Sequence, residues 1–328
     1  TQNYEFLTNL TITFIIRQYQ LIIFVMKKSK YIWFNDKFVQ WDKATTHVLS
    51  HGLHYGSGIF EGIRAYSNKK NTFIFRLSDH YTRFYNSAKV AFIKIPYSQK
   101  KLENATLELI KKNKLKDCYI RPLAFIGDGS IGINPSNNKI NVIIAAFKWG
   151  TYLGEEGVKK GIRAKISSFS RMGVNSFMTK SKISGNYINS VFAKREALNA
   201  GYDEALMLDT DGYISEGTGE NIFIVRNNKI KTTPITSVLE GITRDCVIEI
   251  AKNNNLEVIE QKFTRDELYI ADEVFLSGTA AEITPVREID DRKISSGSPG
   301  KITKIIQEEY KNLVRGINNP TSNYLTKI

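Results

Sequence analysis

Residues 216–244 read EGTGENIFIVRNNKIKTTPITSVLEGITR, and this stretch decides how the rest of the chain is interpreted. It opens with two carboxylates among small residues, Glu216 and Glu220, and leads into an apolar run at 222–225 that predicts a strand. Further on, Gly241 precedes an expected helix that begins near Thr243. Free backbone N–H groups at a helix start suit a phosphate. Taken alone, the same residues also fit a tight loop with surface carboxylates and an ordinary helix start.

Composition limits the class of protein. Hydrophobic residues make up 42% and charged residues 24% of the 328 residues, which excludes a wholly disordered chain. At about 150 residues per domain, this length predicts two domains. The two cysteines, Cys118 and Cys246, form no CxxC pair, so a disulfide scaffold and a cysteine zinc site are excluded and a cytoplasmic, reduced compartment is indicated. The four histidines form no HExxH metal motif.

The chain is basic, with 46 Lys and Arg against 33 Asp and Glu and a formal net charge of +13. Such an excess is one feature of nucleic-acid-binding proteins. Here the basic residues are spread along the sequence in ones and twos, so nucleic-acid binding is the minor alternative. The net positive charge can instead attract anionic substrates through the electrostatic field of the whole protein.

The first 25 residues differ from the rest. They are apolar and β-prone, but Arg17, Gln18 and Gln20 interrupt the run, so a membrane-spanning helix is not expected. A secretory signal would have a basic start and a small-residue cleavage site, and both are missing. The sequence MKKSK from Met26 reads like a natural start. We therefore expect residues 1–25 to be an upstream extension that the natural protein lacks.

The remaining sequence mixes strands and helices without the regular alternation of a doubly wound fold. Asn35 and Asp36 lie between two β-prone runs and predict a hairpin. Ser78 is a plausible N-cap for a helix, and the polar tail after Gly316 predicts no element. Gly150, Gly154, Gly157 and Gly161 indicate an interdomain connection at 148–161. Strands are expected at 118–125, 139–147, 163–168, 204–208 and 221–225, and helices at 77–89, 98–114, 185–199, 243–254 and 301–313.

Two more segments contain residues that could take part in catalysis or binding. Lys182, in the run SKISGNY, stands just before a predicted helix start, although a lysine chosen at random is usually a solvated one and Lys180 is a rival for any role. Residues 277–285, SGTAAEITP, form a turn of small residues whose amides could bind an anion. Each segment alone is a weak signal.

In this order, the segments resemble the signature of the class IV pyridoxal-phosphate aminotransferases. The signature covers EGTGENIF from Glu216, then IKT from Ile230 and LEGITR from Leu239. FEGIRAY at 60–66, YIRP at 119–122 and KxxGNY from Lys182 look like the bacterial branched-chain amino acid aminotransferases in particular. The resemblance extends over nearly all of residues 30–313.

The resemblance implies a mixed α/β protein of fold-type IV. A small N-terminal α/β domain at 26–147, a connection at 148–161 and a larger pseudo-barrel domain at 162–328 that binds pyridoxal 5'-phosphate are expected. The implied reaction is reversible transfer of the amino group of L-leucine, L-isoleucine or L-valine to 2-oxoglutarate, giving branched 2-oxo acids and L-glutamate by a ping-pong route. A homodimer at least is implied, with no nucleic-acid or membrane partner and no metal.

The family pattern also implies roles for residues around the cofactor. Lys182 is the lysine that bonds covalently to the cofactor and moves the proton, with Lys180 structural. Glu216 keeps the pyridine nitrogen protonated, and Tyr187 donates to the phenolic oxygen. The phosphate is expected to bind donors from three segments, Arg83, Ile242, Thr243 and Thr279.

The implied substrate pocket accepts both an aliphatic side chain and the second carboxylate of glutamate. Arg121 is the residue expected to engage that carboxylate, and Ile133 is expected to reach the site of a neighbouring subunit. Gly62 and Arg64 lie on the adjoining strand. The other expected contacts are an aromatic lining and a turn that binds the α-carboxylate: Tyr55, Phe60, Tyr119, Trp149 and Tyr152, and Thr279, Ala280 and Ala281.

Two alternatives within the fold are a D-amino acid aminotransferase and an aminodeoxychorismate lyase. YIRP at 119–122 and FEGIRAY at 60–66 argue against both. The presence of Lys182 and Glu216 argues against a catalytically inactive relative. The sequence does not rank leucine, isoleucine and valine, since a difference of one methylene is worth only about 1–3 kcal/mol.

Overall fold

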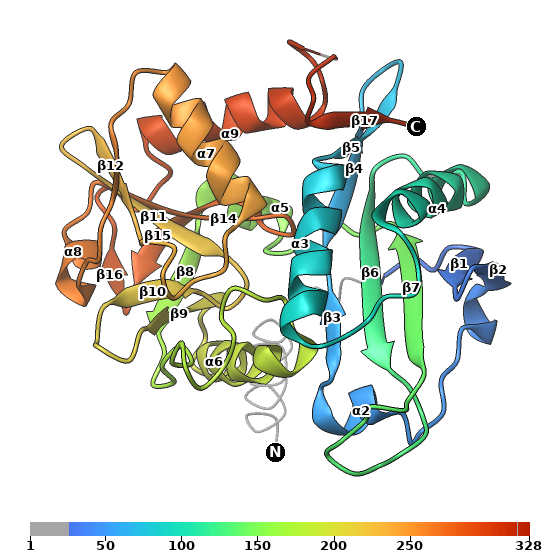
Figure 1. Ribbon diagram of the computed structural model, residues 1–328. Helices are drawn as coiled ribbons and strands as arrows, with labels where there is room; N and C mark the ends of the chain where they lie inside the picture. Colours follow the sequence, from blue (N-terminus) through green and yellow to red (C-terminus); the bar gives the residue numbers. More distant parts are fainter. Residues whose placement is uncertain (1–25, 320) are drawn as a thin grey trace, which may run out of the picture.

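The computed structural model describes residues 26–319 and 321–328, so the expectation for residues 1–25 lies outside the described residues. Two β-sheets form the two halves of the molecule (Figure 1). Each sheet has its own helices, which confirms the mixed α/β class expected from the sequence. Within the described ranges, no helix is long and apolar enough to cross a membrane.

The first sheet has eight strands in the order β17-β5-β4-β6-β7-β1-β2, with β3 on β6. Helices α3 (Leu77–Val90) and α4 (Gln99–Lys112) pack together and cover the core of this half, where Tyr81, Phe84 and Leu109 are fully buried. The strands are β1 (Tyr31–Phe34), β2 (Lys37–Gln40), β3 (Gly58–Phe60), β4 (Ile63–Ser67), β5 (Thr72–Phe75), β6 (Cys118–Ile126), β7 (Ile140–Phe147) and β17 (Leu325–Lys327), with the short helices η1 (Trp41–Lys43) and α2 (His51–Tyr55) beside them.

The second sheet has nine strands in the order β10-β9-β8-β15-β14-β11-β12-β13, with β16 on β15. Helices α7 (Ile242–Asn253) and α9 (Lys301–Val314) lie against each other over β14, and α6 (Tyr187–Asn199) packs on β9. The strands are β8 (Ile162–Ile166), β9 (Glu204–Leu208), β10 (Ile214–Gly217), β11 (Asn221–Arg226), β12 (Lys229–Thr232), β13 (Val258–Glu260), β14 (Glu273–Gly278), β15 (Glu282–Ile289) and β16 (Arg292–Lys293). Three short helices complete this half: α5 (Glu155–Lys160), η2 (Ser184–Asn186) and α8 (Arg265–Tyr269).

The two halves are joined at several places. Residues 148–161 run from β7 to β8 and include α5, and the chain end returns to the first sheet, where β17 pairs with β5. Helix α3 lies between the halves (Figure 1), and its Arg83 donates to the carbonyl of Glu240 at 2.8 Å. The division into domains at 147 and 162 stays a prediction.

Two local predictions were wrong. The helix expected from Leu77 begins there, but its N-cap is Arg76 and not Ser78. Arg76 has a φ of 51°, in the left-handed region, and its guanidinium binds Asp245 at 2.7 Å. The tail after Gly316 was expected to form no element, but it forms β17. Backbone pairing to β5 stabilises this strand, and Leu325 and the preceding Tyr324 pack against a hydrophobic core.

Candidate active site

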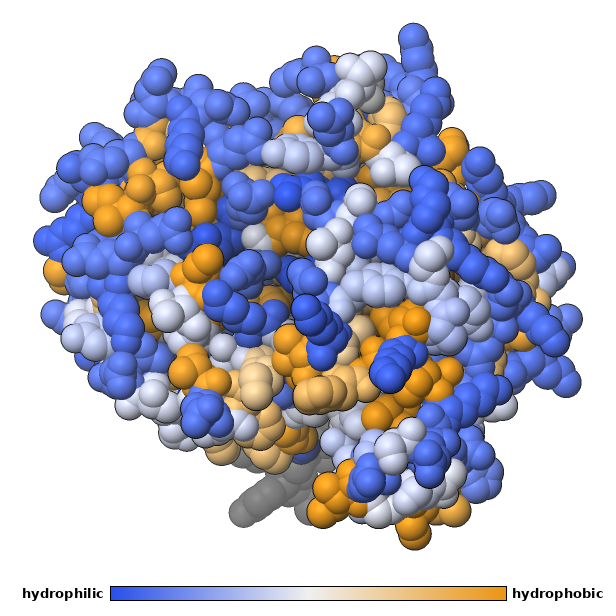
Figure 2. Space-filling model, in the orientation of Figure 1, coloured by the Kyte–Doolittle hydropathy of each residue, from blue (hydrophilic) through white to orange (hydrophobic). Residues whose placement is uncertain are grey.

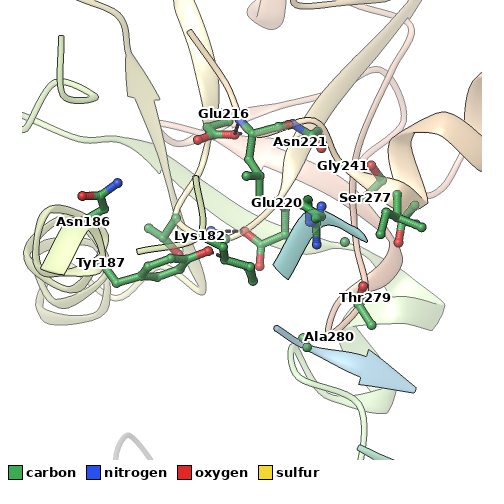
Figure 3. Close-up of a pocket in the computed structure, with 18 of the residues that line it drawn as sticks. Lys182, Asn186, Tyr187, Glu216, Glu220, Asn221, Gly241, Ser277, Thr279 and Ala280 are labelled. Carbon is green, nitrogen blue, oxygen red and sulfur yellow. Dashed lines mark hydrogen bonds between the residues drawn. The ribbon is translucent and has the colours of Figure 1, made fainter. Parts of the chain in front are cut away.

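Lys182 lies where elements of both halves meet. Its backbone N–H donates to Ser87 Oγ of α3 at 3.0 Å, and its carbonyl accepts from the N–H of Phe60 in β3 at 3.0 Å. A β-bridge between Ile59 and Ile183 adds a further link. These bonds fix the backbone, so the side chain has one way to point, into the pocket (Figure 3).

Tyr187, at the start of α6, is the direct partner of the lysine. Lys182 Nζ donates to Tyr187 Oη at 2.6 Å, and the Tyr187 ring packs at 4.8 Å from the ring of Phe60. The Phe60 ring centre is also 4.9 Å from the amine. Lys180, by contrast, is half-exposed and pairs with Glu240 at 3.0 Å, so Lys182 is the lysine of the pocket.

Glu216, in β10, is a buried carboxyl on another wall of the pocket. Its Oε1 lies 2.6 Å from Nε of Arg171, and its Oε2 accepts longer bonds from the Leu239 N–H (3.3 Å) and from Asn221 Nδ2 (3.4 Å). Burial raises the pKa of Glu216, although Arg171 and the Leu239 N–H act in the opposite direction. The cation is therefore what favours the ionised form.

Arg83 lines the pocket from α3 and is held by the fully buried Glu61. Its Nε and Nη2 donate to the two oxygens of that carboxylate at 2.7 and 2.9 Å, and His80 Nδ1 lies 2.8 Å from the same group. Burial would raise the pKa of Glu61, but the charges of Arg83 and His80 hold it well below its usual range. Glu61 holds Arg83 through two parallel hydrogen bonds, and Nη1 donates to the Glu240 carbonyl, which leaves one N–H on each Nη atom for a ligand.

Backbone donors lie on the same side of the pocket as Arg83. Gly241 has an extended backbone and no side-chain cap, so the first amides of α7, at Ile242 and Thr243, are free of a capping side chain. The turn from β14 to β15 adds Gly278, Thr279 and Ala280 to the lining. Because unsatisfied N–H groups at a helix start attract negative charge, this side of the pocket suits a phosphate.

On one wall of the pocket Tyr119 forms the lining, and Arg121, Phe60 and Trp149 pack around it outside the lining. Arg121 Nη2 donates to Tyr119 Oη at 3.0 Å, and the guanidinium lies 4.6 Å from the centre of the Phe60 ring. Trp149 packs edge-on against Tyr119 with ring centres 4.6 Å apart. Gly62 is required beside them, because a Cβ there would stand 2.0 Å from Tyr119 Oη. An apolar surface and a cation are thus adjacent, as a dual-substrate pocket needs.

Other residues expected in the site lie around this wall rather than on the pocket surface. Arg64 donates to the carbonyl of Ala280 at 3.2 Å and Tyr152 packs on Trp149, while Ala281 is fully buried behind the turn. Tyr55 and Ile133 are remote from the pocket lining, half-exposed and 87% exposed respectively. Tyr55 Oη donates to the carbonyl of Ile131, so both belong to one outer loop region.

Sequence reasoning missed three residues with clear places in the site. Arg171 lies in the irregular segment before Lys182, where no periodicity or motif marks it. Glu61 and Asn221 are inside the quoted motifs FEGIRAY and EGTGEN, and their position next to expected functional residues was the available signal.

Comparison with known proteins identifies the family. Residues 58–289 match the family model described as amino-transferase class IV. The chain belongs to the class IV aminotransferases. Among curated relatives of this class IV aminotransferase, the branched-chain-amino-acid aminotransferase of Pseudomonas aeruginosa is 48% identical over 285 residues, which cover 87% of this chain and 93% of the relative. The protein of the same name from Escherichia coli K12 is 47% identical over 292 residues, covering 88% and 94%.

Solved structures agree with this assignment. The Escherichia coli branched-chain amino acid aminotransferase superposes with a TM-score of 0.89 and 46% identity, covering 91% of this chain and 99% of that chain. The T.th. branched-chain amino acid aminotransferase with pyridoxamine 5'-phosphate gives a TM-score of 0.88 at 49% identity, covering 91% and 98%. This class IV aminotransferase therefore has the fold-type IV architecture that the sequence resemblance implied, and pyridoxal 5'-phosphate is its cofactor.

The residues of the pocket fit that cofactor. The fit rests on the donor set: a clamped arginine and free helix amides on one side, and an amine, a phenol and a buried carboxylate on the others. Ser277 Oγ is buried in the lining and has no hydrogen-bond partner among residues 26–319 and 321–328, as is typical of a polar atom that binds a ligand. Figure 3 shows Lys182, Tyr187 and Glu216 on one side of the view and Thr279 and Gly241 on the other.

Proposed function

We propose that this chain catalyses reversible transfer of the amino group of L-leucine, L-isoleucine or L-valine to 2-oxoglutarate. The observation that carries the proposal is the single pocket in which Lys182, Tyr187 and Glu216 converge next to the Tyr119–Arg121 wall. Relatives named branched-chain-amino-acid aminotransferase, at 47–48% identity over most of the chain, support the same reaction.

Lys182 is proposed to hold the cofactor and to transfer the proton during the reaction. The bound cofactor supplies an electron-accepting ring. Lys182 Nζ donates to Tyr187 Oη at 2.6 Å. The phenol can therefore keep the free amine oriented while the amine takes up or gives back a proton. The Phe60 ring covers the amine on one side and limits access of water.

Glu216 is proposed to stabilise positive charge on the ring nitrogen of the cofactor. A carboxylate performs this role only in the ionised form. Because burial disfavours that form, Arg171 is the residue that maintains it, at 2.6 Å. Arg83, Ile242, Thr243 and Thr279 are proposed to hold the phosphate, with Glu61 orienting the arginine.

The substrate side chain is proposed to lie against Phe60, Tyr119 and Trp149, with Arg121 available for a second carboxylate. Two structures of the T.th. enzyme support a pocket of this dual kind, since one is complexed with N-(5'-phosphopyridoxyl)-L-glutamate and another with 4-methylvaleric acid. Ala280 and Thr279 are proposed to bind the α-carboxylate through their turn, which Arg64 braces at the Ala280 carbonyl.

We further propose that the functional unit is at least a homodimer. Large apolar side chains are exposed in the α2 region and in the loop after β6, with Leu53 67% and Ile133 87% exposed. Figure 2 shows apolar residues along the lower part of the molecule, where α2 and α6 lie in Figure 1. Exposed apolar patches of this kind mark protein interfaces. Tyr55 Oη donates to the Ile131 carbonyl of this loop at 3.0 Å, so α2 and the loop would contact a partner together.

The test is an absorbance spectrum of the purified protein with pyridoxal 5'-phosphate, recorded before and after L-leucine and then 2-oxoglutarate. A yellow band that L-leucine bleaches and 2-oxoglutarate restores is expected, and Lys182→Ala should lose the wild-type band. A band indifferent to L-leucine but sensitive to D-alanine would favour a D-amino acid aminotransferase. A colourless protein with a salt-dependent gel shift would favour nucleic-acid binding. The cytoplasmic location stays a prediction from the cysteine content.

A further inference from the structure

Three carboxyl groups are buried together around β9, β10 and the start of β11, and two of them, Glu216 and Glu220, line the pocket. Glu204, Glu216 and Glu220 are 0%, 5% and 3% exposed. A buried carboxylate is stable only when a cation and hydrogen-bond donors compensate its charge. The number of cations available to the three groups therefore decides which of them are ionised.

Two of the three have a cation of their own. Arg171 lies 2.6 Å from Glu216, and Lys194 lies 2.6 Å from Glu204. Glu204 also accepts from the Thr218 hydroxyl at 2.6 Å and from the Ala205 N–H at 2.9 Å. Both groups can therefore remain anionic.

Glu220 has neither a cation nor a full set of donors. In the described part of the chain, no basic side chain pairs with it within 4.0 Å, and its Oε2 accepts only from the Gly219 N–H, at 3.0 Å. The same oxygen lies 2.8 Å from the place where a Cβ on Gly217 would stand, so the backbone closes around it. The other polar groups that face this region are committed or weak: Tyr152 is a neutral phenol, and the Lys182 amine donates to Tyr187.

The electrostatic balance points the same way. Burial, and next the negative charge of Glu204, raise the pKa of Glu220 to about 8, with Glu216 adding to the repulsion. Lys194 and the Gly219 N–H oppose this shift but do not cancel it. Near neutral pH the group carries a proton.

We propose that Glu220 binds substrate as a neutral carboxylic acid, and that its proton allows the pocket to accept the dicarboxylate substrate. Glu220 lines the same pocket as Lys182, Tyr119 and Thr279 (Figure 3), so an ionised Glu220 would repel the bound substrate. The repulsion is larger for 2-oxoglutarate, with two negative charges, than for a branched 2-oxo acid, with one. The inference rests on the proposed aminotransferase function.

The first test is the ratio of two KM values, for 2-oxoglutarate and for 4-methyl-2-oxopentanoate, with L-isoleucine as the constant amino donor. Between pH 7 and pH 9 the wild-type ratio should rise about fourfold to eightfold, for one added unit charge about 8–16 Å away at an effective dielectric constant near 20, because about a tenth of Glu220 is still protonated at pH 9. Other titrating groups remain in both proteins, so the difference between the wild type and Glu220→Gln isolates the charge of Glu220. Glu220→Gln should keep the ratio constant, and Glu257→Gln, which changes an exposed carboxyl paired with Lys229, should behave like the wild type.

The second test does not depend on activity. Infrared difference spectra of the wild type against Glu220→Gln should contain the band of a protonated carboxyl at pH 7, and the band should disappear by pH 10. Absence of that band at pH 7 overturns the proposal, as does a wild-type KM ratio that stays constant with pH. If Glu220→Gln fails to fold, the wild-type ratio alone still decides. A protein with the infrared band but without transaminase activity would refute the proposed function and leave the protonation of Glu220 standing.

Discussion

Arg171→Met tests whether a buried cation keeps Glu216 functional. The substitution preserves an unbranched side chain and removes the charge. Glu216 then remains 5% exposed, with two long hydrogen bonds of 3.3 and 3.4 Å as its support. Burial already raises the pKa of Glu216, so loss of Arg171 raises it further and the group takes up a proton near neutral pH.

The size of the effect follows from burial of the pair. Removing one partner of a buried ion pair costs about 3–5 kcal/mol, and proton uptake by Glu216 should bring the loss in unfolding free energy to the lower end of that range. A neutral Glu216 cannot stabilise the charge on the cofactor nitrogen, so kcat should fall about 100-fold or more at neutral pH, as when other preorganised charges are lost.

The chain offers a matched control in Arg163. Its Nε lies 2.7 Å from Glu288, almost the separation of the Arg171–Glu216 pair, but its side chain is 32% exposed. Arg163→Met should therefore cost only about 0–1 kcal/mol and leave kcat unchanged.

The assays are chemical denaturation and kcat for L-leucine measured against pH. Anionic Glu216 is the active form, so raising its pKa should move the acid limb of the profile of Arg171→Met to higher pH. The reasoning is refuted if the profile of this variant coincides with that of the wild type, or if the two arginine variants lose the same stability.

Three further perturbations follow from other parts of the structure. Gly62→Ala would place a Cβ 2.0 Å from Tyr119 Oη, so the tyrosine ring must move. We expect a loss of about 1–3 kcal/mol in unfolding free energy and a higher KM for 2-oxoglutarate. An unchanged KM would contradict the close approach of the two residues. Ile133→Asp should shift sedimentation from dimer towards monomer, while Ile270→Asp, which changes a residue 54% exposed on α8's end, should not. For Glu220→Gln, the melting temperature should rise relative to the wild type as pH increases from 5 to 8. The carboxyl of Glu220 ionises near 4.5 in the unfolded chain and near 8 in the folded protein, so the stability of the wild type falls over that window. Parallel curves of melting temperature against pH for the two proteins would refute this.

Secondary-structure elements that are determined by neighbouring residues could be predicted from the sequence. The hairpin at 31–40 turns at Asn35 and Asp36, and both residues adopt positive φ, 45° and 68°, as the tight two-residue turn requires. The helix expected at 98–114 forms from Gln99 to Lys112, with the Ser98 side chain accepting from the Lys101 N–H as an N-cap.

Secondary-structure elements that depend on contacts with distant segments of the chain could not be predicted. Helix α3 begins beyond Arg76 because that residue turns through a left-handed conformation and binds Asp245 of α7, which no local pattern reveals. Strand β17 is only three residues long, and it forms because it pairs with the edge of β5 and because Leu325 packs against a hydrophobic core.

The same division applies to the site. Lys182, Tyr187 and Glu216 are recognisable because the motifs around them are contiguous in sequence. Their ionisation states are not recognisable, since these depend on partners from other segments: Arg171 for Glu216, and the clamp of Arg83 for Glu61. A sequence records that a carboxyl is present and leaves open whether it is an anion.

Three buried glutamates that look alike in the sequence differ in whether a cation pairs with them. Glu61 and Glu216 each have an arginine within 2.7 Å, whereas Glu220 has a single backbone donor. The pocket must bind a phosphate and one or two substrate carboxylates, so every unpaired anion in its wall weakens binding. Pairing the first two carboxyls and leaving the third protonated satisfies that demand. The positive field of the clamped Arg83 and the α7 amides is then available to the ligands.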